Sequence, residues 1–523
     1  MNNNFRYLVA GVLIFLIILL QPIYLKWLGY ESSPVSVDGV EAIPVRHEII
    51  DSPVPSTADK LDGYGFENEA PESFITVVTP LYTATISSRS GGSLKSYTLT
   101  QLSSDNYKHR GGYDEYGMYD ENMPVSLILS TKDYCLPCLA VYDDREDKYN
   151  FINAPFRLVG YPDNPDTVFL NSGESIDFKY VLNDIGGNVL VQKSLSFSAD
   201  NFISEHGFTV NDDHLDYVNS LELVWAGGLR PSEKRADEDV QYGSGIISQA
   251  GEIEDVQTKG PDKNIDRIIY NGQTEWAAVR SKYFISALLA ESPGSFATIS
   301  AENMILGDRE QTPLYRISVG FPLDVTGISS RLYLGPLDVD HISSTGTSLD
   351  ETMNWGWTII QPISKGILWV LKFMHNALHL NYGLVLLLFA FLIRLVTGPL
   401  TKKSYESTQK MQKIQPLTKK MQEKYKNDPQ RLQRETMAMY KKHGVNPLGG
   451  CLPMLLQMPL LMALFIVFRS TIEFRGQPFI LWITDLSKPD IVFSLPFNVP
   501  VYGDGVAILP LLMGVTLFLT MRM

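Results

Sequence analysis

A single arginine stands inside a long apolar segment of the chain. Arg394 lies in the stretch 382–399, which otherwise carries no charged side chain. Moving an arginine to the middle of a membrane-spanning helix costs about 2.5 to 3.5 kcal/mol, and such residues usually face a cavity or a partner. Arg394 is 12 residues past Tyr382, which is about 18 Å along a helix. Its long side chain can also reach the nearby inner surface of the membrane, so both positions stay open.

A second polar side chain interrupts another apolar segment. Gln457 is followed by Met458 and lies between Pro453 and Pro459. A glutamine amide in hydrocarbon requires hydrogen-bond partners, and the two prolines leave backbone carbonyl groups unpaired nearby. These residues predict either a polar pocket in the inner half of the membrane or a structural hydrogen bond between helices.

The remaining candidate motifs offer less chemistry. Cys135 and Cys138 have the spacing of a redox pair, but they lack the surrounding βαβ pattern, so a local disulfide or two idle thiols is favoured. His375 and His379 are four residues apart, yet residue 376 is an asparagine where a zinc protease needs glutamate. The sequence also lacks a P-loop. We expect no metal and no cofactor.

Four apolar segments are predicted to hold these residues in a membrane, and each is about long enough to cross the ~30 Å hydrocarbon layer. They are 5–28, 382–399, 446–469 and 506–521. The first is not followed by a small-residue cleavage site, so we interpret it as an uncleaved anchor rather than a removed signal peptide. The chain stops directly after the fourth segment, which we interpret as a truncation with further spans missing.

Charge predicts the orientation of these spans. Residues 400–444 hold 12 Lys and Arg against 4 Asp and Glu, so their formal charge is 12 − 4 = +8. Lys and Arg in short loops near the ends of spans are retained in the cytoplasm, which places the N-terminus inside and residues 30–381 outside. Residues 30–350 carry 23 basic and 49 acidic side chains, or 23 − 49 = −26, which argues against nucleic acid as the main partner.

The regions between the spans differ in pattern. Residues 29–74 are rich in proline and acidic side chains and are predicted to be a disordered linker. Residues 75–345 alternate apolar and polar side chains between glycine-rich turns, as in a large all-β sandwich. Within them, the stretch 276–289 fits either a helix or a fully buried strand. Residues 346–381 are predicted to include an amphipathic helix that lies in the outer interface or packs on the β domain.

The inner segment 400–445 is predicted to be a helical hairpin, and 470–505 a loop on the outer side. Asp428 and Pro429 have the types expected at the start of its second helix, and Gly444 suits the position after its end. Pro416 is expected to kink the first arm. The hairpin can bind acidic lipid, ribosomal RNA or a partner protein through basic residues, which include Lys402, Lys403, Lys419, Lys420 and Lys424.

Several motifs together resemble one protein family. They include Trp355-Gly-Trp, Arg394, Gly398-Pro-Leu-Thr-Lys402, Met411-Gln-Lys-Ile-Gln-Pro416, Asn446-Pro-Leu-Gly-Gly-Cys-Leu-Pro453 and Gln457-Met-Pro459. Over 355–523 the chain resembles the YidC/Oxa/Alb family of membrane protein insertases. The acidic outer region is similar to the periplasmic domain of the Gram-negative members, with 276–284 as its best local match. The resemblance therefore implies a multi-pass α-helical protein with a large extracytoplasmic β-supersandwich domain.

The resemblance also implies a function without enzymatic chemistry. Family members insert nascent integral membrane proteins and help them fold, alone or with the Sec translocon, and they act in the inner membrane. Their substrates enter a hydrophilic groove open to cytoplasm and lipid, whose counterparts here are Arg394, Gln457, Met458 and Pro459. Contacts with the ribosome and with membrane lipids, but not DNA, are implied as well. The alternative from the β domain is a membrane-anchored carbohydrate-binding protein or a mutarotase-like enzyme.

Overall fold

The computed structural model describes residues 71–522 apart from short gaps. The gaps are 104–105, 115–117, 130–134, 144–147, 162–164, 185, 212–219, 259, 261–262, 305–311, 323–326, 427, 445–451 and 500–502. The predicted anchor 5–28 and most of the predicted linker 29–74 lie outside the described residues. The described chain forms two compact units, one from residues up to 480 with 484–487 and one from 481–483 with 488–522.

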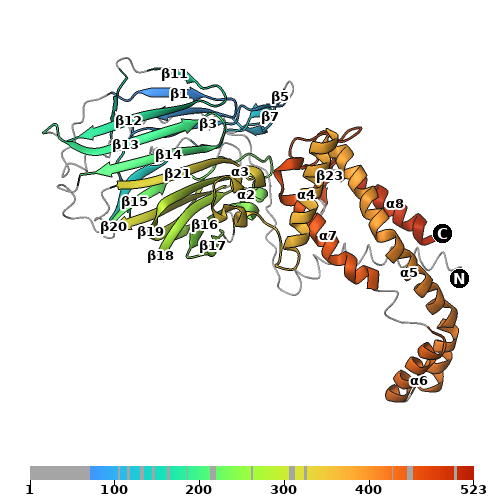
Figure 1. Cartoon of the computed structure of the whole chain (residues 1–523). Coiled ribbons are helices and arrows are strands. Elements are labelled where there is room, and N and C mark those ends of the chain that lie inside the picture. The colour runs from blue at the N-terminus through green and yellow to red at the C-terminus, as the bar shows by residue number, and fades with distance from the viewer. Residues whose placement is uncertain are drawn as a thin grey trace. The chain divides into compact units, whose positions relative to one another are not determined.

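The first unit contains a large β domain (Figure 1). Its strands are β1 (Phe74–Val78), β2 (Thr83–Ser87), β3 (Ser93–Thr98), β4 (Leu102–Ser103), β5 (Asn106–Tyr107), β6 (Arg110–Tyr113), β7 (Tyr119–Pro124), β8 (Cys138–Asp143), β9 (Lys148–Phe151), β10 (Arg157–Val159), β11 (Thr167–Phe169), β12 (Ser175–Asn183), β13 (Val189–Ser198), β14 (Ile203–Val210), β15 (Ser220–Trp225), β16 (Ser244–Gln249), β17 (Glu252–Val256), β18 (Ile265–Arg280), β19 (Phe284–Met304), β20 (Thr312–Pro322) and β21 (Gly327–Pro336).

Two sheets of this domain share one hydrophobic core. A four-stranded sheet has the order β11-β1-β2-β3, and the main path of a 13-stranded sheet runs β10-β12-β13-β14-β21-β19-β20-β15-β8-β9, with β16, β17 and β18 off this path. Along β14, alternate residues point into the core, as its buried and exposed positions show. Val77 of the small sheet and Ile317 and Leu332 of the large sheet belong to the same buried cluster. The alternating pattern of the sequence thus forms a β-sandwich.

The ambiguous stretch 276–289 consists of strands rather than a helix. It contains the end of β18 and the start of β19, which pair in antiparallel register with Trp276 opposite Leu289. Trp276, Ala277 and Ala278 are consecutive and all fully buried. Because successive side chains of a strand point to opposite faces, burial of all three means that both faces of the sheet are covered here. This explains why the sequence shows no alternation.

The described chain also contains helices: the first lies between β15 and β16, and the others follow β21. They are α2 (Ala236–Tyr242), α3 (Val339–Ser343), the 3₁₀ helix η3 (Ser348–Thr352), α4 (Gln361–Leu378), α5 (Tyr382–Lys424), α6 (Pro429–Lys442), α7 (Leu452–Ser470) and the 3₁₀ helix η4 (Ile472–Phe474). One helix in the described part of the chain is long and apolar enough to cross a membrane by length and composition, namely α5 over Tyr382–Pro399. Gln457–Ser470 and Ile508–Thr520 are shorter apolar stretches.

Helix α5 runs without interruption from the predicted span into the predicted hairpin. The Asn381 side chain accepts a hydrogen bond of 2.9 Å from the Leu384 amide and so caps its first turn. Neither Pro399 nor Pro416 ends the helix, although each removes one backbone hydrogen bond. The boundary expected at 399–400 is therefore not a break in secondary structure.

The second unit contains strands β22 (Ile491–Val499) and β23 (Gly503–Ala507) and helix α8 (Ile508–Arg522). The strands form an antiparallel hairpin in which Ile491 lies opposite Ala507. A Cβ on Gly505 would come within 2.6 Å of the Ile491 side chain, so the close pairing requires glycine there. The segment 470–505 is thus not a plain loop, because it includes η4 and most of this hairpin.

Candidate functional site

Aromatic contacts hold together the last turn of α4, the first turn of α5 and the last turn of α7. The Tyr382 ring at the start of α5 stacks on His375 of α4, with centroids 4.2 Å apart. Tyr382 also meets the edge of Phe474, which in turn contacts Phe468 of α7. These contacts place the first turn of α5 and the last turn of α7 at a common level. The distance of a residue along either helix can therefore be measured from this level.

Among the described side chains, the packed core of these helices covers only part of their length. Phe389 of α5 and Ala463 of α7 are buried, and Ile393 of α5 and Leu460 of α7 are the described apolar residues at the edge of that core. Beyond these positions the described side chains of both helices are largely exposed. Among the described residues, the three-helix core therefore covers the start of α5 and the end of α7 and stops before Arg394 and Gln457.

Arg394 and Gln457 both lie just past the end of this core, and both side chains are exposed. Arg394 is 12 residues from the outer end of α5, and Gln457 is 13 residues from Ser470, which correspond to about 18 and 20 Å of helix. The two residues predicted to form a polar site thus occur at the same level. No ion pair or hydrogen bond joins the Arg394 guanidinium to another described side chain.

Met458 and Pro459 continue this open section of α7. Met458 is 48% exposed, whereas Pro459 is half-buried. On α5 the neighbours of Arg394 are also exposed and apolar, and they include Phe391 and Leu395. This open section therefore combines the Arg394 cation and the Gln457 amide with apolar surface. The cation can attract an acidic side chain, while the apolar surface contacts an apolar segment.

The hairpin is held by a thin apolar contact. Ile414 of α5 and Met439 of α6 are buried against each other, with Met411, Met421 and Tyr440 around them. Asp428 caps α6 by accepting a hydrogen bond of 3.0 Å from the Arg431 amide, and Pro429 begins the helix. Gly444 follows its end with a φ of 63°, a conformation that favours glycine. All three sequence predictions about this helix are confirmed.

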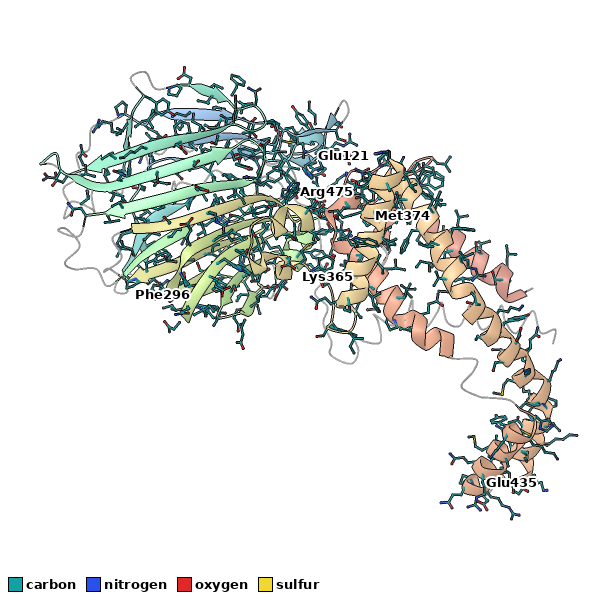
Figure 2. All side chains as sticks on the ribbon, in the orientation of Figure 1. Glu121, Phe296, Lys365, Met374, Glu435 and Arg475 are labelled. Carbon is teal, nitrogen blue, oxygen red and sulfur yellow. A yellow bond between two sulfur atoms is a disulfide. The ribbon has the colours of Figure 1, made fainter. Side chains whose placement is uncertain are left out.

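The basic residues of the hairpin surround a shallow cavity. The predicted contacts Lys402, Lys419, Lys420 and Lys424 and also Pro416 are exposed, and the side chain of Lys403 lies outside the described part. A cavity of about 430 Å³ lies between the two arms. Its lining includes Lys420, Lys424, Lys442, His443 and Glu435, the last of which is labelled on α6 in Figure 2.

Sequence reasoning missed a buried ionic joint between the β domain and the segment after α7. Arg475, labelled in Figure 2, is 7% exposed, and its Nε donates to the Glu233 carboxylate at 2.7 Å. It also donates to the backbone oxygens of Arg110 and Ser232 at 2.8 and 3.2 Å. Its partners are far away in the sequence, so only the fold reveals the pair.

A second ionic cluster lies on α4. The Lys372 ammonium is 3.0 Å from Asp338, 2.7 Å from Asp340 and 3.3 Å from Glu473. Although burial alone lowers it, the charges of Asp338 and Glu473 hold the pKa of Lys372 above its usual value. Burial, together with the charge of Asp338, raises the pKa of Glu473. Three carboxylates thus share one ammonium.

Cys135 and Cys138 form a disulfide, and both residues are buried. Of the two alternatives, the structure shows the local disulfide and not two free thiols. Because the disulfide is buried, a thiol of another protein cannot reach it for disulfide exchange. Within the described residues, no group of three or more His, Cys, Asp or Glu side chains has the arrangement of a metal site.

The class defined by these features is a membrane protein with a large β domain on an apolar helical core. A family model described as "60Kd inner membrane protein" matches residues 373–523, and one described as "YidC periplasmic domain" matches 164–370. The chain belongs to the YidC family of membrane protein insertases.

The relatives that support this assignment match nearly the whole chain. The "Membrane protein insertase YidC" of Chlorobaculum tepidum is 32% identical over 98% of this chain and 83% of its own length. The protein of the same name from Chloroherpeton thalassium is 32% identical over 92% of this chain and 80% of its own. Insertases are not enzymes, so the comparisons favour the insertase prediction over the carbohydrate alternative.

Solved structures with sugar chemistry resemble the chain only weakly. An α-N-acetylgalactosaminidase from Bifidobacterium bifidum covers 45% of this chain with 11% identity and a TM-score of 0.27. A likeness of this size carries no argument about function.

Proposed function

We propose that this insertase passes the polar part of a nascent membrane protein through the open section at Arg394 and Gln457. The observation that carries the proposal is the end of the three-helix core directly before both residues. Water that enters the inner half of the bundle shortens the hydrocarbon path that a polar tail must cross, while the packed outer part keeps the membrane sealed. The family relatives support insertion as the activity.

The driving force in this proposal comes from the substrate and not from a nucleotide. A substrate segment of about 20 apolar residues gains free energy when it moves from the open section into lipid. The unpaired Arg394 attracts acidic residues of the tail into the open section. The membrane potential then adds about 2.3 kcal/mol per charge and per 100 mV for an acidic tail that moves outward.

We further propose a multi-pass arrangement in the inner membrane, with the N-terminus and the hairpin in the cytoplasm and the β domain in the periplasm. The basic hairpin and the acidic β domain support this orientation. In this arrangement α4 lies at the outer interface, because Trp369 and Phe373 are exposed on it and aromatic residues concentrate at that level. Sec translocon subunits, the ribosome and membrane lipids are the proposed partners.

The experiment that tests the open section is crosslinking during synthesis. A photoreactive side chain at Met458 should crosslink to a nascent membrane protein, whereas the same group at Phe373 on α4 should not. Equal crosslinking at both positions would contradict the proposed path.

Substitution of Arg394 gives a second test. A charged hydrogen bond is worth about 1.5 to 3 kcal/mol, so Arg394→Ala should slow insertion of acidic-tailed substrates by roughly tenfold or more. Arg394→Lys should retain much of the activity if positive charge is what matters. Arg434→Ala, on the exposed surface of α6, is the matched control and should insert normally. Normal insertion of every acidic-tailed substrate by Arg394→Ala would refute the proposed role.

A further inference from the structure

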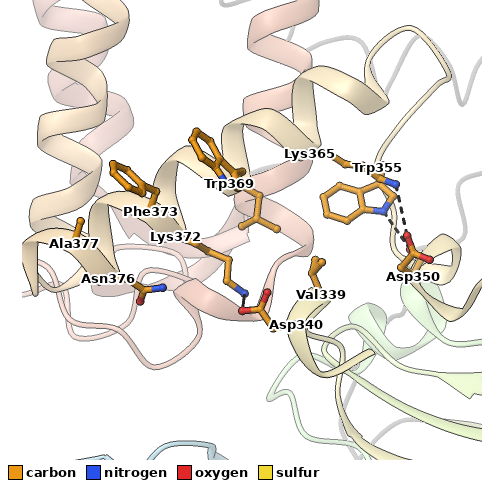
Figure 3. Close-up of a pocket in the computed structure, with 11 residues that line it drawn as sticks. Val339, Asp340, Asp350, Trp355, Lys365, Trp369, Lys372, Phe373, Asn376 and Ala377 are labelled. Atoms are coloured by element: carbon orange, nitrogen blue, oxygen red, sulfur yellow. Dashed lines mark hydrogen bonds and ion pairs between the residues drawn. The ribbon is translucent and has the colours of Figure 1, made fainter. Parts of the chain in front are cut away.

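A cavity of about 610 Å³ lies between α4 and the segment that joins α4 to the β domain. Figure 3 shows its lining, with Lys372 extending from α4 toward Asp340. Residues 365, 369, 372, 373 and 376 of α4 contribute to one wall, since positions three and four apart share a helix face. Val339, Asp340, Asp350 and Trp355 contribute to the other wall.

The two ends of this cavity differ in charge: one has an excess of carboxylates, and at the other an exposed ammonium is balanced by Asp350. At one end Lys372 is surrounded by Asp338, Asp340 and Glu473, so negative charge is in excess, and the Asp340 side chain is 72% exposed. At the other end the Lys365 side chain is 44% exposed, and its ammonium is a loose 3.6 Å from Asp350. An exposed carboxylate and an exposed ammonium are therefore available to a ligand at opposite ends.

Exposed aromatic side chains flank the same cavity. Trp369 and Phe373 are 66% and 58% exposed, and their rings stack with centroids 5.6 Å apart at an interplanar angle of 14°. Large aromatic groups of this kind concentrate at the head-group level of a membrane. A ligand in the cavity can therefore extend an apolar portion along these rings while its polar end contacts the charges.

We propose that this cavity binds the head group of a zwitterionic aminophospholipid, with Lys365 contacting its phosphate and Asp340 its ammonium. The proposal rests on the position of α4 at the outer interface. Excess carboxylate at one end disfavours an anionic lipid, because a second negative group would be repelled there. A primary ammonium can donate hydrogen bonds to Asp340, which a quaternary choline cannot. The two stacked rings lie nearly parallel and so do not enclose a choline group from several sides.

The test uses soluble short-chain lipids and the full chain in detergent stripped of native lipid. Binding of dihexanoyl phosphatidylethanolamine, phosphatidylcholine and phosphatidylglycerol below their micelle concentrations is measured by calorimetry. Phosphatidylethanolamine should bind with a Kd at least about tenfold lower than either other lipid, as one lost charged contact predicts. Equal affinities for the three lipids, or tighter binding of phosphatidylglycerol, would overturn the proposal without any substitution.

Two substitutions separate the ends of the cavity. Lys365→Gln should weaken phosphatidylethanolamine and phosphatidylglycerol alike by about tenfold, whereas Asp340→Asn should weaken only phosphatidylethanolamine by about that factor. Lys179→Gln, on the exposed face of β12, is the control and should leave all affinities unchanged. Unchanged phosphatidylethanolamine binding in both cavity variants would place the lipid elsewhere.

A separate measurement tests the position of α4. Brominated lipid in the outer leaflet of vesicles should quench part of the tryptophan fluorescence of the protein. That quenched part should be missing in Trp369→Phe. Head-group binding without this quenching would contradict the interfacial position of α4. It would not contradict the lipid preference of the cavity.

Discussion

Replacing Arg475 should loosen the joint between the β domain and the segment after α7. In Arg475→Met the Glu233 carboxylate, which is 6% exposed, loses the cation that lies 2.7 Å away. Removing one partner of a buried ion pair costs about 3 to 5 kcal/mol, because the remaining charge stays buried without compensation. At about 1.4 kcal/mol per factor of ten, local opening should become roughly 100-fold to several thousand-fold more frequent.

Amide hydrogen exchange read by mass spectrometry measures this opening directly. The Arg475 and Gln477 amides donate to Ile472 and Phe474, so the peptide that contains them reports on the joint. Its exchange should accelerate by the stated factor in Arg475→Met, while peptides from the interior of β19 should not change. Glu233→Gln added to Arg475→Met should recover part of the protection, because the orphaned charge is gone.

The matched control is Lys365→Gln, which removes an exposed ion pair with a separation of 3.6 Å. Exposed pairs contribute about 0 to 1 kcal/mol, so exchange around residue 475 should stay within a few fold of the parent. The reasoning would be refuted if Arg475→Met also stayed within a few fold, or if the double substitution exchanged faster than the single one.

Three further predictions concern other regions. Burial and the Asp338 charge raise the pKa of Glu473 above its ordinary 4.5. The free energy of unfolding should therefore fall as Glu473 ionises, when the pH rises from 4.5 through the raised value. Glu473→Gln should therefore gain unfolding free energy over the parent from pH 4.5 upward in urea titrations, and a pH-independent difference would contradict this. Asp428→Ala should reduce the stability of α6 by about 1 kcal/mol, seen as faster exchange of its first turn, and unchanged exchange would show that the cap contributes little. Trypsin added to inverted vesicles should cut first between residues 424 and 434, and protection there would contradict the proposed orientation.

Local sequence signals predicted local structure well. Asp428, Pro429 and Gly444 act through contacts within a few residues, so their roles depend little on the rest of the chain. The alternating segments predicted strands for the same reason. The stretch 276–289 could not be assigned, because a strand covered on both faces loses the alternation that identifies it.

Long-range ionic contacts could not be predicted in this way. Arg475 and Glu233 are 242 positions apart, and neither neighbourhood in the sequence has a pattern that selects the other. Arg475 and Lys372 both have partners in or next to the β domain. A deletion of 75–345 should therefore also replace these two cations, because it removes Glu233 from Arg475 and leaves Lys372 with Glu473 alone.

In the proposed mechanism, the distribution of packed and open sections along the helices would let insertion and a sealed membrane coexist. On the outer side, the Tyr382 contacts and the Arg475 ion pair lock the ends of α5 and α7 in place. Past Phe389 and Ala463 this packing stops within about one turn, and Arg394 and Gln457 follow. We propose that a helix pair fixed at one end and unpacked at the other admits water and a polar tail from the unpacked side only. Under this proposal the buried ion pairs of Arg475 and Lys372 would have a mechanical role, because loosening them would allow the packed end to open.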